Sequence, residues 1–236
     1  MIDINNTLDL VKLKFYNEWL YIAHIYEEGD SQMHKDLTKS VVEQYIDPLA
    51  LQKNAKILDL GCGPGYFLDL MKERGYTDVT GVTLSPGDIQ NCESKGHTIK
   101  KYDFSFLPQK DGYYDESVDF IFLRQTLEHS PYPIFSLMEY NRVLKQGSKI
   151  YIEVPAINQD RKHEWNVNHY SVLGNEQLAA LLNRTGFSIN KFDNFQFELN
   201  VPTNENEPID PADPSTFTTV HENYLCIVAT KERPLD

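Results

Sequence analysis

Apolar residues recur along the chain at two different spacings, and the spacing changes near residue 55. In the first part, one set recurs at steps of three and four, which predicts one face of a helix. Its members are Leu8, Val11, Phe15, Trp19, Ile22 and Tyr26. A second set with this spacing predicts another helix that ends before Pro48: Met33, Leu37, Val41 and Tyr45. Residues 1–54 are therefore expected to form a helical N-terminal cap.

From residue 55 onward, short apolar runs alternate with amphipathic segments, which predicts a mostly parallel sheet with helices on both faces. Strands are expected at 56–60, 79–83, 98–102, 118–123 and 149–154. Helices are expected at 66–74, 133–144 and 176–184, with Asn175 as the last N-cap and a turn at Lys145-Gln146-Gly147. Two late strands, at 188–193 and 224–230, are expected to form a closing hairpin, with an acidic proline-rich loop at 200–216 between them.

The first predicted strand runs directly into a glycine-rich turn. Asp59 stands two residues before Gly61, and Gly63 and Gly65 follow at alternate positions. Glycines let the backbone turn sharply and approach a ligand closely, because they have no Cβ. A strand, a glycine-rich turn and a helix predict one half of a nucleotide-binding unit. Tyr66 occupies the position of the last glycine in the dinucleotide fingerprint Gly-x-Gly-x-x-Gly, so an NAD-dependent dehydrogenase is disfavoured.

Composition narrows the range of partners. The 236 residues include 35 acids and 22 bases, for a net charge of −13, which disfavours nucleic acid as a partner. The three cysteines are widely spaced, which favours reduced thiols in a cytoplasm over disulfides or a zinc site. The N-terminus lacks a signal-peptide pattern, and no apolar run is long enough to span a membrane. An ordinary soluble cytoplasmic protein is expected.

The run Asp-Leu-Gly-Cys-Gly-Pro-Gly at 59–65 resembles motif I of the class I S-adenosylmethionine-dependent methyltransferases. The resemblance is strong over residues 56–155 and extends more weakly to about residue 187. It implies a Rossmann-like, mostly parallel seven-stranded sheet in residues 55–236 and S-adenosylmethionine as the cofactor. The motif I residues implied to bind it are Asp59, Gly61, Cys62, Gly63 and Gly65, with Cys62 as a small buried residue rather than a reactive thiol.

The resemblance also assigns the nucleoside end of the cofactor. The family usually has an acid after the second strand that binds both ribose hydroxyls, but this chain has Thr83 there, followed by Leu84. In the variant seen in cyclopropane-synthase-like relatives, a polar residue five positions later helps to bind the ribose, and that residue is Asp88. After the third strand, Asp103 is expected to accept a hydrogen bond from the adenine amine, with the Phe104 backbone at a ring nitrogen.

The fourth strand leads into Leu-Arg-Gln-Thr-Leu-Glu-His, which is similar to the type 11 methyltransferases. Leu123, Arg124 and Gln125 are expected to line the methionine end of the cofactor, because ligands bind at the carboxyl edge of such sheets. The candidate general bases are Glu128, His129, His163 and His169, and the order of preference is His169, then His129. The six-residue spacing of the two histidines at 163 and 169 disfavours a metal site, and none is expected.

Aromatic residues with polar tips suit a small-molecule or carbohydrate-linked acceptor, and equally an ordinary interface between the cap and the core. The expected pocket residues are Tyr16, Tyr21, His24, His34, Trp165 and Tyr170. Three alternatives remain beside a small-molecule methyltransferase. The first is a carbon-alkylating, cyclopropane-synthase-like enzyme, which the Thr83 variant suggests. The second is a non-catalytic S-adenosylmethionine-binding subunit that works with a partner. The third is the disfavoured dehydrogenase.

Overall fold

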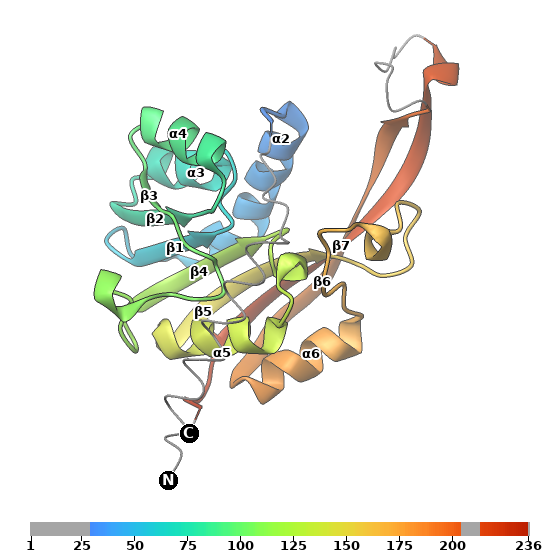
Figure 1. Ribbon diagram of the computed structural model, residues 1–236. Coiled ribbons are helices and arrows are strands. Elements are labelled where there is room, and N and C mark those ends of the chain that lie inside the picture. The colour runs from blue at the N-terminus through green and yellow to red at the C-terminus, as the bar shows by residue number, and fades with distance from the viewer. Residues whose placement is uncertain (1–28, 204–212, 236) are drawn as a thin grey trace.

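A seven-stranded sheet forms the centre of the computed structural model, which describes residues 29–203 and 213–235 (Figure 1). The strand order is β3-β2-β1-β4-β5-β7-β6. β1 to β5 run parallel, whereas β7 runs antiparallel to β5 and β6 antiparallel to β7. The strands are β1 Lys56–Leu60, β2 Asp78–Val82, β3 Thr98–Lys100, β4 Val118–Arg124, β5 Leu144–Pro155, β6 Phe187–Pro202 and β7 Phe217–Lys231. The expected Rossmann-like sheet with a closing antiparallel hairpin is confirmed.

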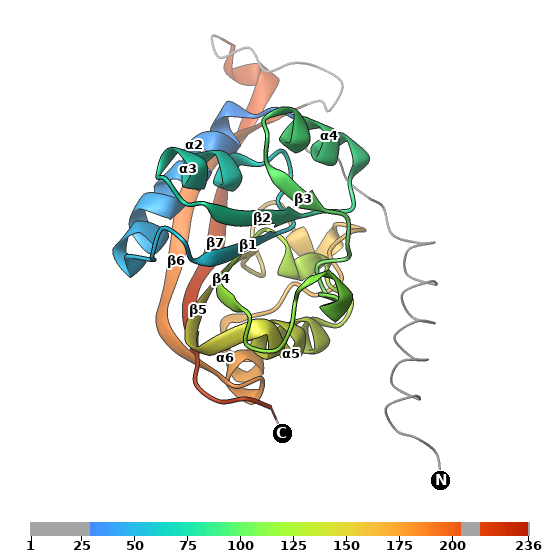
Figure 2. The ribbon, with the colours of Figure 1, turned by 90° about the vertical axis from the view of Figure 1, so that its left-hand side faces the viewer.

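Helices cover both faces of this sheet (Figure 2). One face is covered by α2 Gln32–Val41, α3 Tyr66–Glu73 and α4 Pro86–Ser94, and the other by α5 Pro133–Val143 and α6 Asn175–Arg184. Short helical turns complete the described elements: η1 Val42–Ile46, η2 Asp47–Leu49, η3 Gln109–Asp111, η4 Leu127–His129, η5 His163–Trp165 and η6 Pro214–Thr216. The strand residues that point to opposite faces belong to two separate apolar clusters, as expected for a sheet buried on both sides.

The helix predicted over residues 8–26 lies outside the described residues. The second predicted helix is present as α2 and η1, and Pro48 is the second residue of the short turn η2 that follows it. Val42, Tyr45 and Ile46 pack in one cluster with Phe67 and Phe122. This segment therefore shares its core with the sheet.

Two local predictions were wrong. Asn175 is the first residue of α6, and Gly174 is its N-cap. The predicted turn at 145–147 lies within β5, where Leu144 pairs with Val118 and Lys149 with Phe120. The residues between these two pairings form an irregular bulge that contains Gly147 at a φ of 77°. Bulges of this kind need a residue that tolerates positive φ, so the same sequence signal serves a bulge and a turn.

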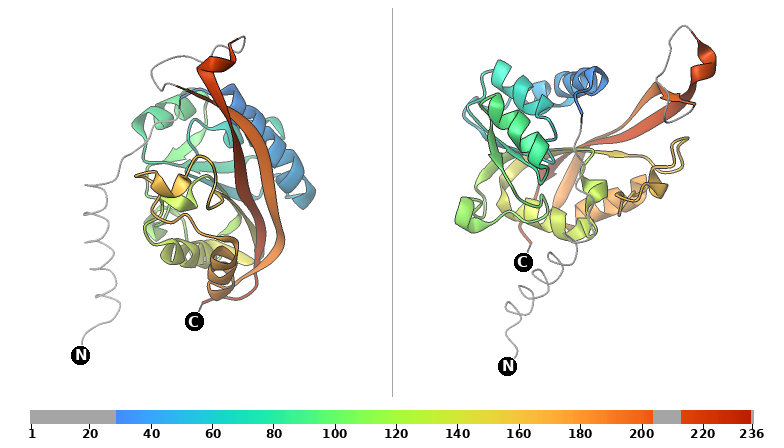
Figure 3. Two further views of the ribbon diagram at one scale, coloured as in Figure 1. Left: turned by 90° about the vertical axis from the view of Figure 1, so that its right-hand side faces the viewer. Right: turned by 45° about the horizontal axis from the view of Figure 1, so that its top comes forward.

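The closing hairpin extends well beyond the sheet as a two-stranded arm (Figure 3). β5 pairs only with β7 residues up to Tyr224, whereas β6 and β7 stay paired out to Pro202 and Phe217. Both strands are longer than predicted, and the expected loop at 200–216 is correspondingly shorter. Alternating apolar residues in Phe-Gln-Phe-Glu-Leu-Asn-Val at 195–201 have the two-residue period of a strand. The prolines that follow predicted a loop, so the end of the strand was assigned to that loop.

Candidate functional site

The carboxyl ends of β1 and β4 meet where the strand order reverses, and open α/β sheets bind ligands at such a position. The glycine-rich turn lies here. Gly61, Gly63 and Gly65 have φ angles of 74°, 49° and 88°, a region that other residues rarely adopt. The N–H groups of Gly61 and Cys62 both donate to the Val82 carbonyl at the end of β2, at 2.8 and 3.1 Å. The turn is thus fixed to the neighbouring strand.

Side chains pack closely behind the turn. A Cβ on Gly61 would lie 2.4 Å from Thr126 Oγ1, and one on Gly65 would lie 2.8 Å from Cys92 Sγ. The Thr126 hydroxyl lies 3.0 Å from the carbonyl oxygens of both Leu60 and Arg124, which joins the ends of β1 and β4. Sequence reasoning missed Thr126.

The cysteines at 62, 92 and 226 are free thiols and are buried.

Asp59 is a buried carboxylate beside this turn. Its Oδ2 has no hydrogen-bond partner among the described residues. Burial raises its pKa to about 8, and the charge of Arg124 acts in the opposite direction. A cavity of about 40 Å³, lined among others by Asp59, Gly61, Tyr66 and Arg124, adjoins it. That volume holds one or two water-sized groups. An ammonium group such as that of the expected cofactor fits the size of this cavity and would give the Asp59 oxygen a hydrogen-bond donor.

The residues expected at the ribose lie on the turn between β2 and α4. Thr83 Oγ1 accepts a hydrogen bond from the Ser85 N–H, and Ser85 in turn caps α4 through the Asp88 N–H. The Thr83 hydroxyl therefore helps to shape its own loop. Asp88 is buried in the first turn of α4, and Leu84 is half-buried. The structure brings these residues to the same edge of the sheet as the glycine-rich turn.

Asp103 and Phe104 follow β3 at that edge. Asp103 Oδ1 accepts a hydrogen bond of 2.7 Å from the Ser105 N–H, which is the geometry of an Asx turn. Burial raises the pKa of the Asp103 carboxyl, although the bonds from Ser105 oppose the shift. Phe104 packs against the apolar cluster beneath. One carboxylate oxygen thus fixes the loop, and an adenine amine could use the other.

The end of β4 contains a buried polar network that the sequence did not indicate. Arg124 Nε lies 3.0 Å from Glu153 Oε1, and Gln125 Nε2 donates to the same oxygen at 3.2 Å. The Tyr151 hydroxyl donates to the other Glu153 oxygen at 2.9 Å. Leu123, by contrast, is buried in the apolar core. Arg124 and Gln125 are therefore held by Glu153, which lies on β5.

The candidate bases gather around η4, which begins three residues after the end of β4. The loop after β5 contacts this turn: the N–H groups of Tyr170 and Ser171 donate to the Glu128 carbonyl at 2.8 and 3.0 Å. The Ser171 hydroxyl lies 3.1 Å from the Leu127 carbonyl oxygen and 2.8 Å from that of Ser130. These contacts bring His169 against His129, with their ring centroids 4.8 Å apart and nearly perpendicular. The structure thus unites candidates that lie 40 residues apart in the sequence.

Both imidazoles are held in a neutral state. Burial lowers the pKa of His129. Burial also lowers the pKa of His169 to about 4, with further contributions from the positive charges that His129 and His163 would carry. Glu128 is fully buried, and burial raises its pKa to about 8, with the Glu153 carboxylate adding to the shift. A neutral imidazole has a lone pair that can accept a proton, although the lowered pKa makes His169 a weaker base than an ordinary histidine.

His163 lies outside this cluster. Its Nε2 is 2.8 Å from the buried Glu222 carboxylate on β7, while its ring stacks on His169 at 5.5 Å. Glu222 also lines a pocket of about 540 Å³ between the loop after β5 and the arm. Its other lining residues are Ile157, Asn158, Gln159, Asp160, Gln196, Phe197, Glu198, His221 and Asn223. His163 therefore connects the imidazole cluster to this pocket.

The aromatic residues expected around the acceptor are placed differently. Trp165 is 80% exposed and Tyr170 is 40% exposed, so neither forms a closed pocket wall. His34 lies on α2, and Tyr16, Tyr21 and His24 fall outside the described residues. The residues that line the pocket are mostly polar, and sequence reasoning missed them because they meet only when the arm and the loop fold together.

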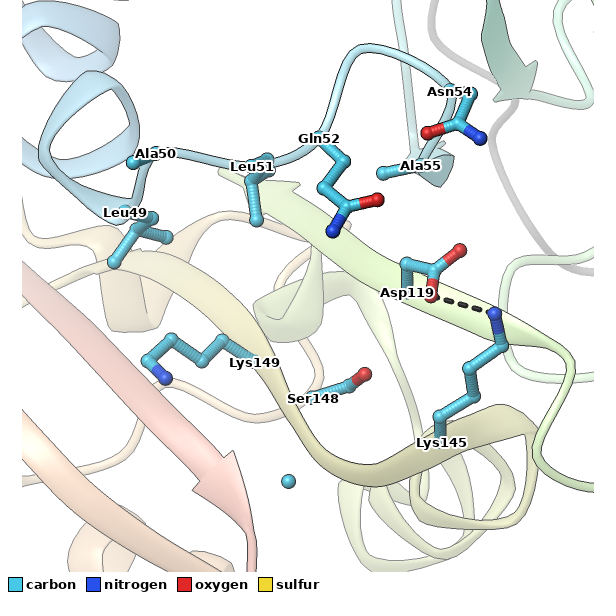
Figure 4. Close-up of a pocket in the computed structure, with 11 residues that line it drawn as sticks. Leu49, Ala50, Leu51, Gln52, Asn54, Ala55, Asp119, Lys145, Ser148 and Lys149 are labelled. Carbon is cyan, nitrogen blue, oxygen red and sulfur yellow. Dashed lines mark hydrogen bonds and ion pairs between the residues drawn. The ribbon is translucent and has the colours of Figure 1, made fainter.

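A second large pocket, of about 450 Å³, opens at the opposite edge of the sheet (Figure 4). It is lined by residues that precede or begin β1, β4 and β5, and includes the ion pair of Lys145 and Asp119 at 2.6 Å. Ligands of open α/β sheets bind at the carboxyl ends of strands, so this pocket is not the expected site.

Among the described helices, none is long and apolar enough to cross a bilayer.

Replacing Glu128 by glutamine should stabilise the protein at neutral and alkaline pH. The pKa is about 8 in the folded state against 4.5 in the unfolded chain, so the folded state binds the extra proton between these values. Stability from this group is present below 4.5 and is lost as pH rises through about 8. Glutamine resembles the protonated acid. We expect a gain in unfolding free energy on the order of 3 kcal/mol near pH 8 and almost none near pH 4.

Urea unfolding at both pH values measures this gain. Glu93→Gln, on the exposed side of α4, is the matched control and should change stability little at either pH. A Glu128→Gln protein that is no more stable than wild type at the higher pH would show that the carboxylate has a partner in the folded state.

Comparison with known proteins finds similarity to methyltransferases. A family model described as a methyltransferase domain matches residues 31–191. The ubiquinone biosynthesis O-methyltransferase of Saccharophagus degradans is 28% identical over 170 residues, which cover 70% of this chain and 68% of that protein. The tRNA U34 carboxymethyltransferase of Shewanella frigidimarina is 28% identical over 139 residues, which cover 56% of this chain. The match spans only 40% of that relative's length.

The fold also has solved counterparts. The crystal structure of an S-adenosylmethionine-dependent methyltransferase from Archaeoglobus fulgidus superposes with a TM-score of 0.61 at 22% identity. It covers 84% of this chain and 94% of its own. At this identity the likeness concerns the fold alone.

Proposed function

Because the chain belongs to the methyltransferase family whose model matches more than half of its length, we propose that it methylates a hydroxyl group of a small, polar or carbohydrate-linked acceptor. S-adenosylmethionine is the cofactor. When bound, it supplies a methyl group that is already activated on a positively charged sulfur. The protein then has two tasks: to hold the acceptor oxygen in line with that methyl group and to remove the hydroxyl proton.

The proposed cofactor contacts follow the carboxyl edge of the sheet. The turn of Gly61, Gly63 and Gly65 presents its backbone to the methionine part, and the unpartnered Asp59 oxygen receives its ammonium group. Arg124 and Gln125, held by Glu153, border that end. Asp88 and Asp103 serve the ribose and the adenine. The match between S-adenosylmethionine and this site rests on the buried Asp59 oxygen. That oxygen has no partner in the described part of the chain and lies beside a cavity of ammonium size.

The observation that supports a small acceptor is the lining of the pocket between the arm and the loop after β5. Its side chains include the carboxylates of Asp160, Glu198 and Glu222, with amides and a histidine beside them. Such a lining suits hydroxyl-rich or cationic molecules. A polyanion such as RNA would meet repulsion here, in a chain whose net charge is already −13. The volume of about 540 Å³ lies in the range of small-molecule sites.

The imidazole cluster is the proposed base. His169 is our first candidate and His129 the second, because burial keeps both rings neutral and able to accept a proton. Glu128 lies beside them. His163 contacts both sides: it bonds to Glu222, which lines the pocket, and its ring stacks on His169.

A tracer experiment tests the acceptor class. The full chain is incubated with methyl-labelled S-adenosylmethionine and either a low-mass cell extract or purified bulk tRNA. We expect label to be incorporated into low-mass compounds only, and hydrolysis by acid and base then distinguishes methyl ethers from methyl esters. The control is the Gly63→Val protein, which should transfer no label.

Three other outcomes would overturn the proposal. Label in tRNA would align the chain with its tRNA-modifying relatives. Methylated lipid would favour the carbon-alkylating alternative. Tight cofactor binding without transfer to any fraction, together with a stable partner in pull-downs, would indicate a non-catalytic subunit.

A further inference from the structure

Three groups that commonly bind metal ions converge at η4. They are the carboxylate of Glu128, the imidazole of His129 and the imidazole of His169 from the loop after β5. One ligand atom from each lies within 4.8 Å of the other two. The two rings stand at 81° to one another, so they do not stack. Three ligands from two segments of the chain define a site that the sequence spacing did not indicate.

The hydrogen bonds of the two histidines determine which nitrogen is free. Nδ1 of His129 is 2.8 Å from the Asn168 carbonyl oxygen, and Nδ1 of His169 is 3.0 Å from the His163 carbonyl oxygen. A carbonyl oxygen can only accept, so each Nδ1 carries the proton. In a neutral imidazole the lone pair is then on Nε2. Histidines that bind metals in proteins are oriented in this way, with the second nitrogen donating to a carbonyl or carboxylate.

Glu128 provides the second, independent observation. Its side chain is fully buried, and neither carboxylate oxygen has a hydrogen-bond partner among the described residues. The guanidinium of Arg124 is already paired with Glu153. A buried carboxylate without a partner is costly, and proteins usually compensate for it with a cation or hydrogen bonds. A metal ion between the two Nε2 atoms would supply that compensation.

We propose that Glu128, His129 and His169 bind a divalent metal ion of the zinc type, with a fourth position open. Two histidines and one carboxylate are the ligand set of many catalytic zinc sites. Two ligands at ~2.1 Å from one ion are at most ~4.2 Å apart, so the three side chains must move slightly closer. Rotation of Glu128 is the easiest movement, because its carboxylate breaks no hydrogen bond to the described residues.

The role of this ion rests on the proposed function. An acceptor hydroxyl bound at the open position becomes more acidic and releases its proton to water. The oxygen then forms a bond to the methyl carbon while the carbon–sulfur bond breaks, and the sulfur keeps the electron pair. In the metal-bound protein the two histidines are ligands and do not accept the proton, so the base role proposed above applies to them only in the metal-free protein.

Metal binding by the full chain tests the proposal without an acceptor. Protein stripped with a chelator is titrated with Zn²⁺ by competition against a chromophoric chelator, and with Co²⁺ by visible absorption. We expect one ion per chain and the intense bands of a four-coordinate Co²⁺ site. Glu128→Gln, His129→Ala and His169→Ala should each weaken Zn²⁺ binding at least ~100-fold. His97→Asn, whose ring contacts Asp69 on α3, is the matched control and should bind like wild type.

Absence of a stoichiometric ion in folded wild type would overturn the metal site. Binding that survives in all three variants, or that is lost equally in His97→Asn, would do so as well. Methyl transfer that persists unchanged in metal-free protein would refute the catalytic role of the ion while leaving the proposed function intact. Methyl transfer that is lost with the ion and restored by Zn²⁺ would support both.

Discussion

Replacement of Gly63 by valine is expected to weaken binding of S-adenosylhomocysteine at least ~100-fold, which corresponds to about 2.7 kcal/mol. Gly63 is the middle glycine of the turn after β1, with a φ of 49°. A β-branched residue is strained at this angle, and it adds bulk to a turn that we propose to approach the cofactor closely. Calorimetric titration of the purified variant measures the loss.

Gly75→Val separates loss of the ligand site from backbone strain. Gly75 follows α3, is exposed, and has a φ of 78°, with no atom within 4 Å of a Cβ added there. The two variants should lose similar amounts of stability, but only Gly63→Val should lose the ligand. Unchanged affinity in folded Gly63→Val would remove the turn from the cofactor site. Equal loss of affinity in both variants would show that the effect is global.

Replacement of His169 by alanine should lower kcat by about 10²–10⁴, the usual contribution of a positioned base. The affinity for S-adenosylhomocysteine should stay within about twofold, because the ring contacts η4 and His163 rather than the glycine-rich turn. His169→Asn retains a donor for the His163 carbonyl and should be as impaired as alanine. Turnover of the identified acceptor by both variants is measured beside His97→Asn, which should retain activity.

The pH profile gives a second readout for His169. Its pKa is lowered to about 4, so the ring stays neutral above that value, whereas an ordinary histidine becomes protonated below about 6.5. At saturating cofactor, kcat should therefore change little between about pH 5 and pH 7. A steep fall with a midpoint near 6.5 would show that the working base is an unperturbed histidine elsewhere. Full activity in both His169 variants would exclude this residue altogether.

Much of the fold could be predicted because it depends on local patterns. The apolar run before Gly61 predicted β1, and the glycine spacing predicted the turn that follows. Errors occurred where one residue type serves two structures. Gly147 predicted a turn but lies in a bulge, and the prolines after Val201 concealed the end of β6. In each case pairing with a distant strand decided between the two structures.

The site was predictable only in part, because its key contacts join residues far apart in the chain. Thr126 packs on Gly61, and Glu153 holds Arg124, yet neither has a local signal. His129 and His169 were candidates individually, but only the folded loop after β5 places them together with Glu128. The sequence suggested which residues carry chemistry. The tertiary structure showed which of them can act as a unit.

Titration of the wild-type chain with S-adenosylhomocysteine, with NAD as the control ligand, tests the central claim most directly. The geometry at Asp59, the glycine-rich turn and Asp103 predicts one site of micromolar or tighter affinity for S-adenosylhomocysteine and no binding of NAD. A folded protein that binds neither ligand, or that binds NAD as tightly as S-adenosylhomocysteine, would contradict a methyltransferase site at this edge of the sheet.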